Sequence, residues 1–391
     1  MKLTRQYIEK HLFLLALLVY AGASYFIMPA IDNTAEMGTM DTVFSETVAI
    51  IASLPYLLFA LKDLLQKKHD KTVKYFLVFF VWAVIATVLN YSAPSYIVFA
   101  MMPFFPLLIS YLYFRKYELD KAFYIAFFLS FLVISFRYLQ IYQTAHFNAD
   151  TQHIGVSYFA LVTFPLVLLH PSKTVRIAAW IITLLIVTSS IKRGGLIAFS
   201  AGAVVYMVCK QYVSPKKWLW SFILLLLAFI VFSASLIYAI SYFESEILDR
   251  IARSRDDQGS GRLEIWKMVI DDISRSDTFS LVCGHGYLSV CNLTNNEGLP
   301  AHNDFLEVLY DFGLTGIVLY GIAWLSLVGK TLRMLREKSE LAPVMALMVS
   351  VFFILSMISI VIYYFQITYI LLFIGTVIGQ YELRKTNSLV V

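Results

Sequence analysis

The stretch that decides the fold runs from Ile177 to Cys209 and reads IAAWIITLLIVTSSIKRGGLIAFSAGAVVYMVC. One straight helix of these 33 residues would be about 50 Å long, whereas the hydrocarbon layer of a bilayer is about 30 Å thick. Two charges at the bilayer centre would be costly, and the glycines after them favour a break. The stretch therefore predicts two short spans, with Lys192 and Arg193 in water at a tight turn.

Apolar blocks like these repeat along the whole chain. Of its 391 residues 59% are hydrophobic and only 15% are charged, against about one quarter charged in a soluble domain. Backbone groups in hydrocarbon must pair within their own segment, so each block predicts a helix. The predicted fold class is an all-α polytopic membrane protein with about 12 transmembrane helices: His11–Pro29, Val43–Leu61, Tyr75–Asn90, Tyr96–Phe114, Ala122–Tyr142, Ile154–Leu169, Ile177–Ser190, Gly195–Cys209, Trp218–Ile240, Gly313–Val328, Ala342–Val361 and Tyr364–Gln380.

The placement of Lys and Arg predicts the orientation of the chain. With the N-terminus inside, the cytoplasmic segments hold 22 of them and the outer segments hold 8. Cytoplasmic loops carry an excess of these residues, so both termini are predicted to be cytoplasmic. We expect the protein in the inner (cytoplasmic) membrane, with its long loop on the periplasmic side.

That loop, residues 241–312, has 72 residues, far more than any other outer connection. Long loops with their own patterning commonly carry function. The spacing of apolar residues predicts amphipathic helices that lie on the membrane surface or cap the bundle, at Ser241–Arg255, Arg262–Ile273 and His302–Phe312. The chain thus divides into a bundle at 1–240, a catalytic loop at 241–312 and a second bundle at 313–391.

Two of the three cysteines, Cys283 and Cys291, fall in this loop. A secretory compartment oxidises thiols, so a disulfide that closes CGHGYLSVC is predicted. The alternative is a pair of free buried thiols. Cys209, at a helix end, is interpreted as inert packing.

Three points on the outer side suit chemistry at a phosphorylated sugar. These are Lys192–Arg193 at the tight turn, Arg262 in GSGRLEIW and His302 in AHNDFLEVLYDFGLTG. The planar fork of Arg donates two parallel hydrogen bonds to a phosphate and stays charged. Histidine suits proton abstraction near neutral pH. Together they favour a reaction that expels pyrophosphate while a hydroxyl is deprotonated.

Each of these points also has a purely structural interpretation. Lys192 and Arg193 would hold a turn at the lipid headgroups, and Arg262 would pair with Glu264 on a solvated face. His302 would only precede a helix, with Asn303 or Asp304 as the N-cap.

Two further residues have open alternatives. His285, between two glycines, is a turn residue or a substrate contact, and the turn is favoured. Arg137, inside a predicted span, reaches the outer interface or faces an outer cavity.

Several kinds of site are missing from the sequence. There is no Walker A motif, no GxGxxG, no HExxH and no GxSxG. The acidic residues of the loop form no clean metal cluster. No cofactor, metal or nucleic-acid partner is therefore predicted.

Taken together, these elements resemble the bacterial O-antigen ligase/polymerase superfamily. The resemblance rests on the multi-span layout, the large outer loop and three motifs in order. The motifs are SSIKRGGLIAF, then GSGRLEIW followed by the G-x-G turn of Gly284 and Gly286, then His302-Asn303 with nine residues before Gly313-x-x-Gly316.

The resemblance implies a glycosyltransferase whose donor is an undecaprenyl-pyrophosphate-linked glycan, without nucleotide or metal. By that resemblance Arg193 and Arg262, with Lys192 beside them, bind the pyrophosphate, and His302 is the general base on the acceptor. Asn303 is a further substrate contact. Partners are the lipid-linked donor and acceptor, membrane lipids and, as a candidate, a chain-length-regulating membrane protein.

Two kinds of enzyme in this family differ in the acceptor to which they transfer the glycan. A polymerase transfers to another lipid-linked repeat unit, whereas a ligase transfers to the lipid A core, which is often phosphorylated. Residues 241–312 hold 13 Asp and Glu against six Lys and Arg, a field that disfavours a phosphorylated acceptor. The sequence therefore favours the polymerase. A transporter of lipid-linked sugars is the alternative from another class, although most spans lack the midplane charges typical of one.

Overall fold

The computed structural model describes residues 4–27, 40–65, 69–90, 92–144, 156–190, 193–215, 262–293 and 299–388, without the side chains at 40–42, 144, 156 and 193. These residues form helices and connections and include no β-strand. The helices are α1 (Arg5–Ile27), α2 (Met40–Phe59), α3 (Leu61–Leu64), α4 (Lys71–Leu89), α5 (Pro94–Met101), α6 (Phe104–Phe114), α7 (Lys121–Thr144), α8 (Val156–Leu168), α9 (Lys173–Ser189), α10 (Arg193–Val213), α13 (Arg262–Arg275), α14 (Thr278–Cys283), the 3₁₀ turn η3 (Ser289–Asn292), α15 (Asp304–Arg336), α16 (Ala342–Ile358) and α17 (Gln366–Ser388).

The all-helical class is confirmed over the described residues. Six stretches are long and apolar enough to cross a membrane: Arg5–Ile27, Lys71–Leu89, Pro94–Phe114, Lys121–Gln143, Gly194–Val213 and Asp304–Arg336. Each predicted span outside 216–261 coincides with a described helix or pair of helices. The predicted span Trp218–Ile240 and the predicted helix Ser241–Arg255 lie outside the described residues. The total of twelve crossings and the division at 240 and 312 therefore stay predictions.

The predicted break within Ile177–Cys209 is confirmed, because α9 ends at Ser189 and α10 begins at Arg193. The glycines after Arg193 have a packing role as well. A Cβ on Gly194 would lie 2.6 Å from the Tyr158 hydroxyl and 2.7 Å from Ile358. Glycine therefore lets the start of α10 press against α8 and the end of α16.

The predicted span Tyr96–Phe114 is confirmed within the stretch Pro94–Phe114, although this stretch is divided at Met102–Pro103 into α5 and α6, because proline has no N–H to continue the helical ladder. One predicted segment was wrong in detail. The segment His302–Phe312 is not a separate surface helix. It forms the first turns of α15, which bends at Gly313, and its acidic side chains are buried in the protein.

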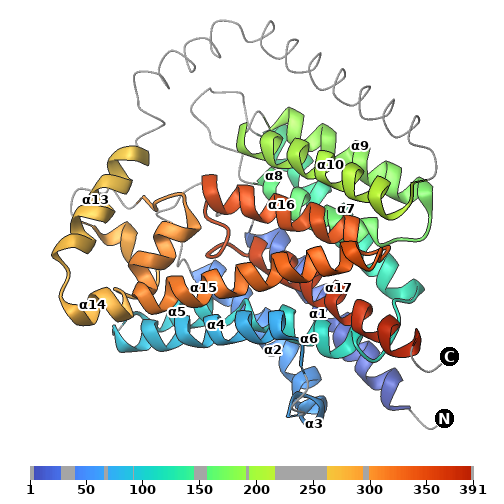
Figure 1. Ribbon diagram of the computed structural model, residues 1–391, viewed down its shortest axis with the longest axis horizontal. Coiled ribbons are helices and arrows are strands. Elements are labelled where there is room, and N and C mark those ends of the chain that lie inside the picture. The colour runs from blue at the N-terminus through green and yellow to red at the C-terminus, as the bar shows by residue number, and fades with distance from the viewer. Residues whose placement is uncertain are drawn as a thin grey trace, which may run out of the picture.

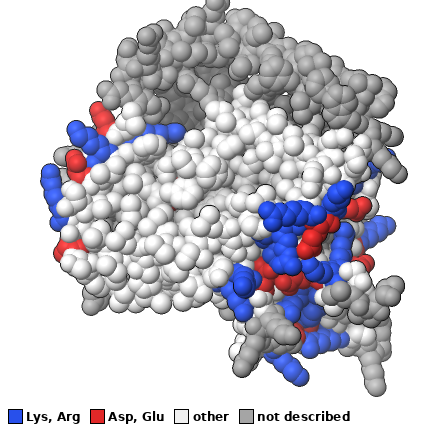
Figure 2. Space-filling view, viewed as in Figure 1, with Lys and Arg blue, Asp and Glu red and all other residues white. Residues whose placement is uncertain are grey.

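Charged side chains separate to the two ends of the bundle. Figure 1 shows α13 and α14 at one end and both termini at the other. Figure 2 shows a broad surface without charge between them. Near the termini the charges pair, as in Arg5–Glu9 at 2.8 Å, Lys10–Asp120 at 2.5 Å and Lys385–Glu337 at 2.9 Å. An uncharged band between two polar ends is the arrangement that a bilayer requires.

The bend in α15 interlocks with the turn that follows α14. Gly313 (φ 68°, ψ −169°) and Gly284 (φ 79°, ψ −171°) both adopt backbone angles open almost only to glycine. A Cβ on Gly313 would lie 2.4 Å from the Val282 carbonyl oxygen, and one on Gly284 would lie 2.3 Å from that of Asp311. The turn that follows α14 is therefore docked on α15 by direct backbone contact.

We expect Gly313→Ala to lower the stability of the full chain by at least about 1–3 kcal/mol, because both the backbone angles and the contact with Val282 exclude a side chain. The matched control is Gly321→Ala on the same helix, where nothing lies within 4 Å of the added carbon. Thermal melting in detergent measures both variants. Equal melting temperatures for the two would contradict the interlock.

Candidate functional site

The candidate site is organised by three carboxylates on the first turns of α15. Asp304, Glu307 and Asp311 are each fully buried. Their spacing of three and four residues places them on one face of the helix. A buried carboxylate is tolerated only with hydrogen-bond donors around it, so the segments that supply those donors are held against this face.

Asp304 holds the connection between α16 and α17. Its carboxylate accepts hydrogen bonds from the Ser356 hydroxyl at 2.7 Å and from the amides of Val361 at 2.8 Å and Ile362 at 3.3 Å. The outer ends of α16 and α17 are thereby fixed beside the start of α15.

Asp311 holds the turn of Gly284 and Gly286. It accepts from the amides of Leu288 at 2.7 Å and Ser289 at 3.0 Å, and from the Tyr363 hydroxyl at 2.6 Å. The turn is fastened further where its own amides at 285 and 286 donate to the carbonyls of 310 and 311. The G-x-G motif is therefore part of the scaffold of the site.

His302 lies directly before this helix, in a backbone conformation that is uncommon for a side-chain-bearing residue. Its φ is +52°, in the left-handed region, and its side chain is partly exposed. Asn303 is the N-cap: its side-chain oxygen accepts from the amides of Phe305 at 3.0 Å and Leu306 at 3.1 Å. The N-cap interpretation therefore belongs to Asn303, whose amide group also donates to the Met357 carbonyl at 3.4 Å.

Arg262 is the first residue of α13 and is partly exposed. One turn later Trp266 donates its indole N–H to the carbonyl of Ala301 at 2.7 Å. Residues four apart share a helix face, so Arg262 is on the side of α13 that contacts the residue before His302. Arg262 also lies within electrostatic range of the Tyr158 hydroxyl, the group against which Gly194 packs.

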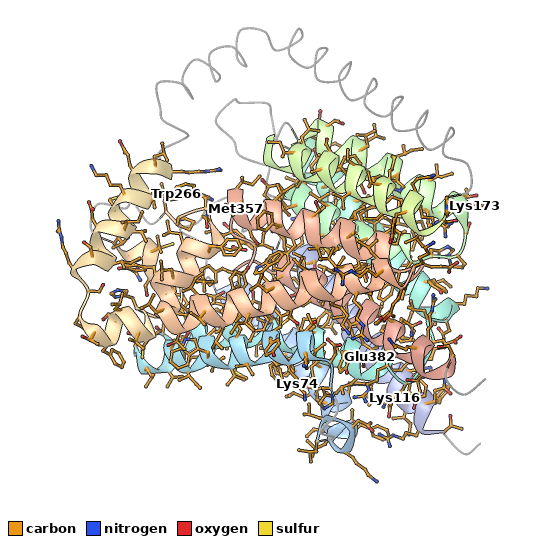
Figure 3. The ribbon with its side chains drawn as sticks, viewed as in Figure 1. Lys74, Lys116, Lys173, Trp266, Met357 and Glu382 are labelled. Carbon is orange, nitrogen blue, oxygen red and sulfur yellow. The ribbon has the colours of Figure 1, made fainter. Side chains whose placement is uncertain are left out.

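These contacts bring the starts of α10, α13 and α15 to the same end of the bundle. Tyr158 lies against the start of α10 and within electrostatic range of Arg262, and Trp266 joins α13 to the residue before His302. Figure 3 shows Trp266 and Met357 toward this end, away from Lys116 and Glu382. Lys192 and the side chain of Arg193 lie outside the described residues, so their predicted role stays a prediction.

His285 is packed within the turn. Its ring stacks on Tyr310 at a centroid distance of 4.3 Å and 17°, and Nε2 lies 3.1 Å from the Ser276 hydroxyl. Burial lowers the pKa of His285, although Asp272 and Asp277 act in the opposite direction. These contacts favour the turn role over a substrate contact.

Arg137 contacts a different part of the protein. Its guanidinium lies over the Tyr25 ring of α1 at 4.8 Å and donates to Gln140 at 3.3 Å. These contacts join α7 to α1 and include no residue of the cluster around His302. A substrate contact for Arg137 therefore stays a prediction.

The predicted disulfide is wrong, because Cys283 and Cys291 are both free thiols. Cys283 ends α14, whereas Cys291 lies in η3 and packs against the main apolar core. Burial raises the pKa of the Cys291 thiol. The bonds from the turn to Asp311 close this loop without a cross-link.

Sequence reasoning missed Trp266, Tyr158 and the roles of Glu307 and Asp311. The acidic residues of the loop were counted only as a negative field. Their spacing of 304, 307 and 311 was the available signal, since it puts three acids on one face of a predicted helix. Nothing in the sequence marked Tyr158. Among the described residues no group of three or more His, Cys, Asp or Glu side chains has the geometry of a metal site.

Residues 177–321 match the family model described as O-antigen ligase. This match supports the resemblance of the chain to the O-antigen ligase/polymerase superfamily. The matched segment begins in α9 and ends in α15, so it includes Arg193, Arg262 and His302. No curated protein sequence matches the chain.

The match supports a coarse function. It favours an enzyme of the O-antigen ligase/polymerase type, and that family implies lipid-linked glycan substrates. The apolar helices and the matched family together support an integral membrane protein. The three motifs that carried the resemblance lie at the starts of α10, α13 and α15, where the contacts above converge.

The half-buried His285 of the turn predicts that the folded chain is less stable in acid. Because the folded state lowers the pKa of His285, the unfolded chain binds more protons between that lowered pKa and about 6.5. Stability is therefore fully present above about 6.5 and declines as the pH falls below it. We expect His285→Gln to flatten this decline, measured as melting temperature between pH 7 and pH 5. An unchanged slope would contradict the assignment.

Proposed function

We propose that the chain is a glycosyltransferase that polymerises undecaprenyl-pyrophosphate-linked oligosaccharide repeat units on the periplasmic face of the inner membrane. The observation that carries this proposal is the hydrogen bond from Trp266 of α13 to Ala301, which ties the Arg262 helix to the residue before His302. A pyrophosphate-binding arginine and a proton acceptor on the same side of the bundle are what such a transfer needs.

The donor would bind through its pyrophosphate. Arg262 and Arg193 each begin a helix, where the positive end of the helix dipole adds to the charge of the guanidinium. A cation in the first turn gains nothing from that dipole, so capping does not explain either arginine. Bidentate hydrogen bonds from arginine would neutralise the diphosphate as it departs.

His302 would act as the general base. The acceptor hydroxyl attacks the anomeric carbon of the donor, and its proton passes to the imidazole. The bond from that carbon to the pyrophosphate oxygen breaks, and the electron pair leaves with the lipid pyrophosphate. Attack from the side opposite the leaving group inverts the anomeric centre. The arginines supply the charge neutralisation, and the scheme uses no nucleotide or metal.

The surface of the bundle supports a lipid-linked substrate. Large apolar side chains are exposed on several helices, among them Phe136 of α7 at 57%, Leu185 of α9 at 61% and Leu325 of α15 at 74%. Such side chains suit contact with acyl chains and with a polyprenyl tail that enters from the bilayer. Membrane lipids and the lipid-linked donor are therefore the partners that the proposal names.

The charge of the loop at 241–312 is the basis for choosing between the two possible acceptors. The loop at 241–312 carries 13 acidic residues against six basic ones. A negative field repels a phosphorylated lipid A core more than a second repeat unit. This favours the polymerase over the ligase, and a chain-length-regulating membrane protein is a further proposed partner.

A lipid analysis of a deletion strain tests the function. If the chain is the polymerase, deletion leaves surface glycan as single repeats on the lipid A core. If it is the ligase, the core carries no glycan and long chains accumulate on the polyprenyl carrier. A normal distribution of polymer lengths on the core would contradict both assignments.

Complementation of the deletion strain with His302 variants tests the proposed role of His302 as the general base. General-base catalysis contributes about 10²–10⁴-fold, so His302→Ala should leave the single-repeat pattern at normal expression. The control is His11→Ala, an exposed histidine near the N-terminus, which should restore long chains. Full polymer length with His302→Ala would rule out the proposed mechanism.

A further inference from the structure

The backbone of Ala301 is held on both sides of its Cα atom. Its N–H donates to the Glu307 carboxylate, and its carbonyl accepts the indole N–H of Trp266 at 2.7 Å. Ala301 itself is fully buried. These two bonds, from α15 and from α13, are here called the Ala301 clamp. They fix the residue that directly precedes His302.

The residue after His302 is fixed as well, since Asn303 is the N-cap of α15. His302 therefore lies between two anchored residues, and its φ of +52° is one that a side chain disfavours. Such a conformation persists only where the surroundings over-determine it, and it is common at functional sites. The Ala301 clamp and the N-cap supply that constraint.

Glu307 differs from the other two buried carboxylates in what it binds. Asp304 and Asp311 each accept at least three hydrogen bonds and hold connections between helices. Among the described residues Glu307 accepts one hydrogen bond, from the Ala301 amide, and its Oε2 has no partner. A fully buried carboxylate with one unsatisfied oxygen is a costly way to stabilise a fold. The hydrogen bond that Glu307 does accept comes from Ala301, the residue directly before His302.

We propose that Glu307 and Trp266 are positioning residues for His302, acting through the backbone N–H and carbonyl of Ala301. The inference rests on the proposed role of His302 as the base. The clamp sets the direction of the imidazole, so its loss should lower kcat and leave KM for the lipid-linked donor unchanged. Misplacement of a catalytic group by about 1 Å costs about 10²-fold in rate.

Two substitutions of Glu307 separate the reach of the side chain from the identity of its end group. Glu307→Gln keeps an oxygen at the same distance and replaces the carboxyl group by an amide, whereas Glu307→Asp keeps the carboxyl group and is one methylene too short to reach Ala301. The full chain is reconstituted in proteoliposomes with an undecaprenyl-pyrophosphate-linked oligosaccharide, and kcat and KM are measured. We expect Glu307→Gln to retain kcat within about threefold and Glu307→Asp to lose about 10–100-fold, with KM unchanged in both.

The reverse order of the two variants would overturn the proposal, because the carboxyl group and not the reach to Ala301 would then matter. An effect on KM alone, or wild-type kcat in Glu307→Asp, would overturn it too. Trp266→Phe keeps the aromatic packing and removes the other half of the clamp, so it should also lower kcat. If thermal melting shows that Glu307→Asp does not fold, the kcat of Trp266→Phe tests the proposal in its place.

A readout that needs no enzymatic activity separates this inference from the proposed function. The rate at which diethyl pyrocarbonate modifies His302 is measured by mass spectrometry on the full chain. Glu307→Asp and Trp266→Phe should change that rate, and Glu307→Gln should not. Equal rates in all the proteins would overturn the clamp. A wild-type chain without polymerising activity would refute the proposed function and leave this comparison valid.

Discussion

The burial of three carboxylates on one face of α15 is the constraint on which the outer end of the protein depends. Each of Asp304, Glu307 and Asp311 is fully buried and must find hydrogen-bond donors. Those donors come from segments far apart in the chain: the α16–α17 connection, residue 301 and the turn at 284–289. The hydrogen bonds that these three carboxylates accept therefore hold together the segments around His302.

Close backbone packing completes that scaffold. Gly284 and Gly313 allow the turn and the bend of α15 to touch directly, and Gly194 allows α10 to approach Tyr158. A disulfide is unnecessary in such a loop, because the amides of the turn already bind Asp311. The apolar bundle below is held by side-chain packing, with charges kept to its two ends (Figure 2). The same helix, α15, thus belongs to both the membrane core and the site.

Much of the fold was predictable because membrane helices are set by length and hydropathy. The break between α9 and α10 followed from the cost of placing Lys192 and Arg193 in hydrocarbon. The interruption at Pro103 and the merging of 302–312 into α15 were not predicted, because they depend on local backbone geometry and on tertiary packing. Of the site, Arg262 and His302 were found by residue chemistry and by family resemblance. Trp266 and Glu307 were not, because their partners are distant backbone groups that no local pattern reveals.

The central claim is that a diphosphate at the starts of α10 and α13 faces the base at the start of α15. Cryo-electron microscopy of the full chain bound to an undecaprenyl-pyrophosphate-linked sugar tests it most directly. The account predicts diphosphate oxygens in contact with the guanidinium groups of Arg193 and Arg262, and the His302 imidazole directed at the sugar. A diphosphate bound elsewhere, or a His302 side chain turned away from the sugar, would contradict it.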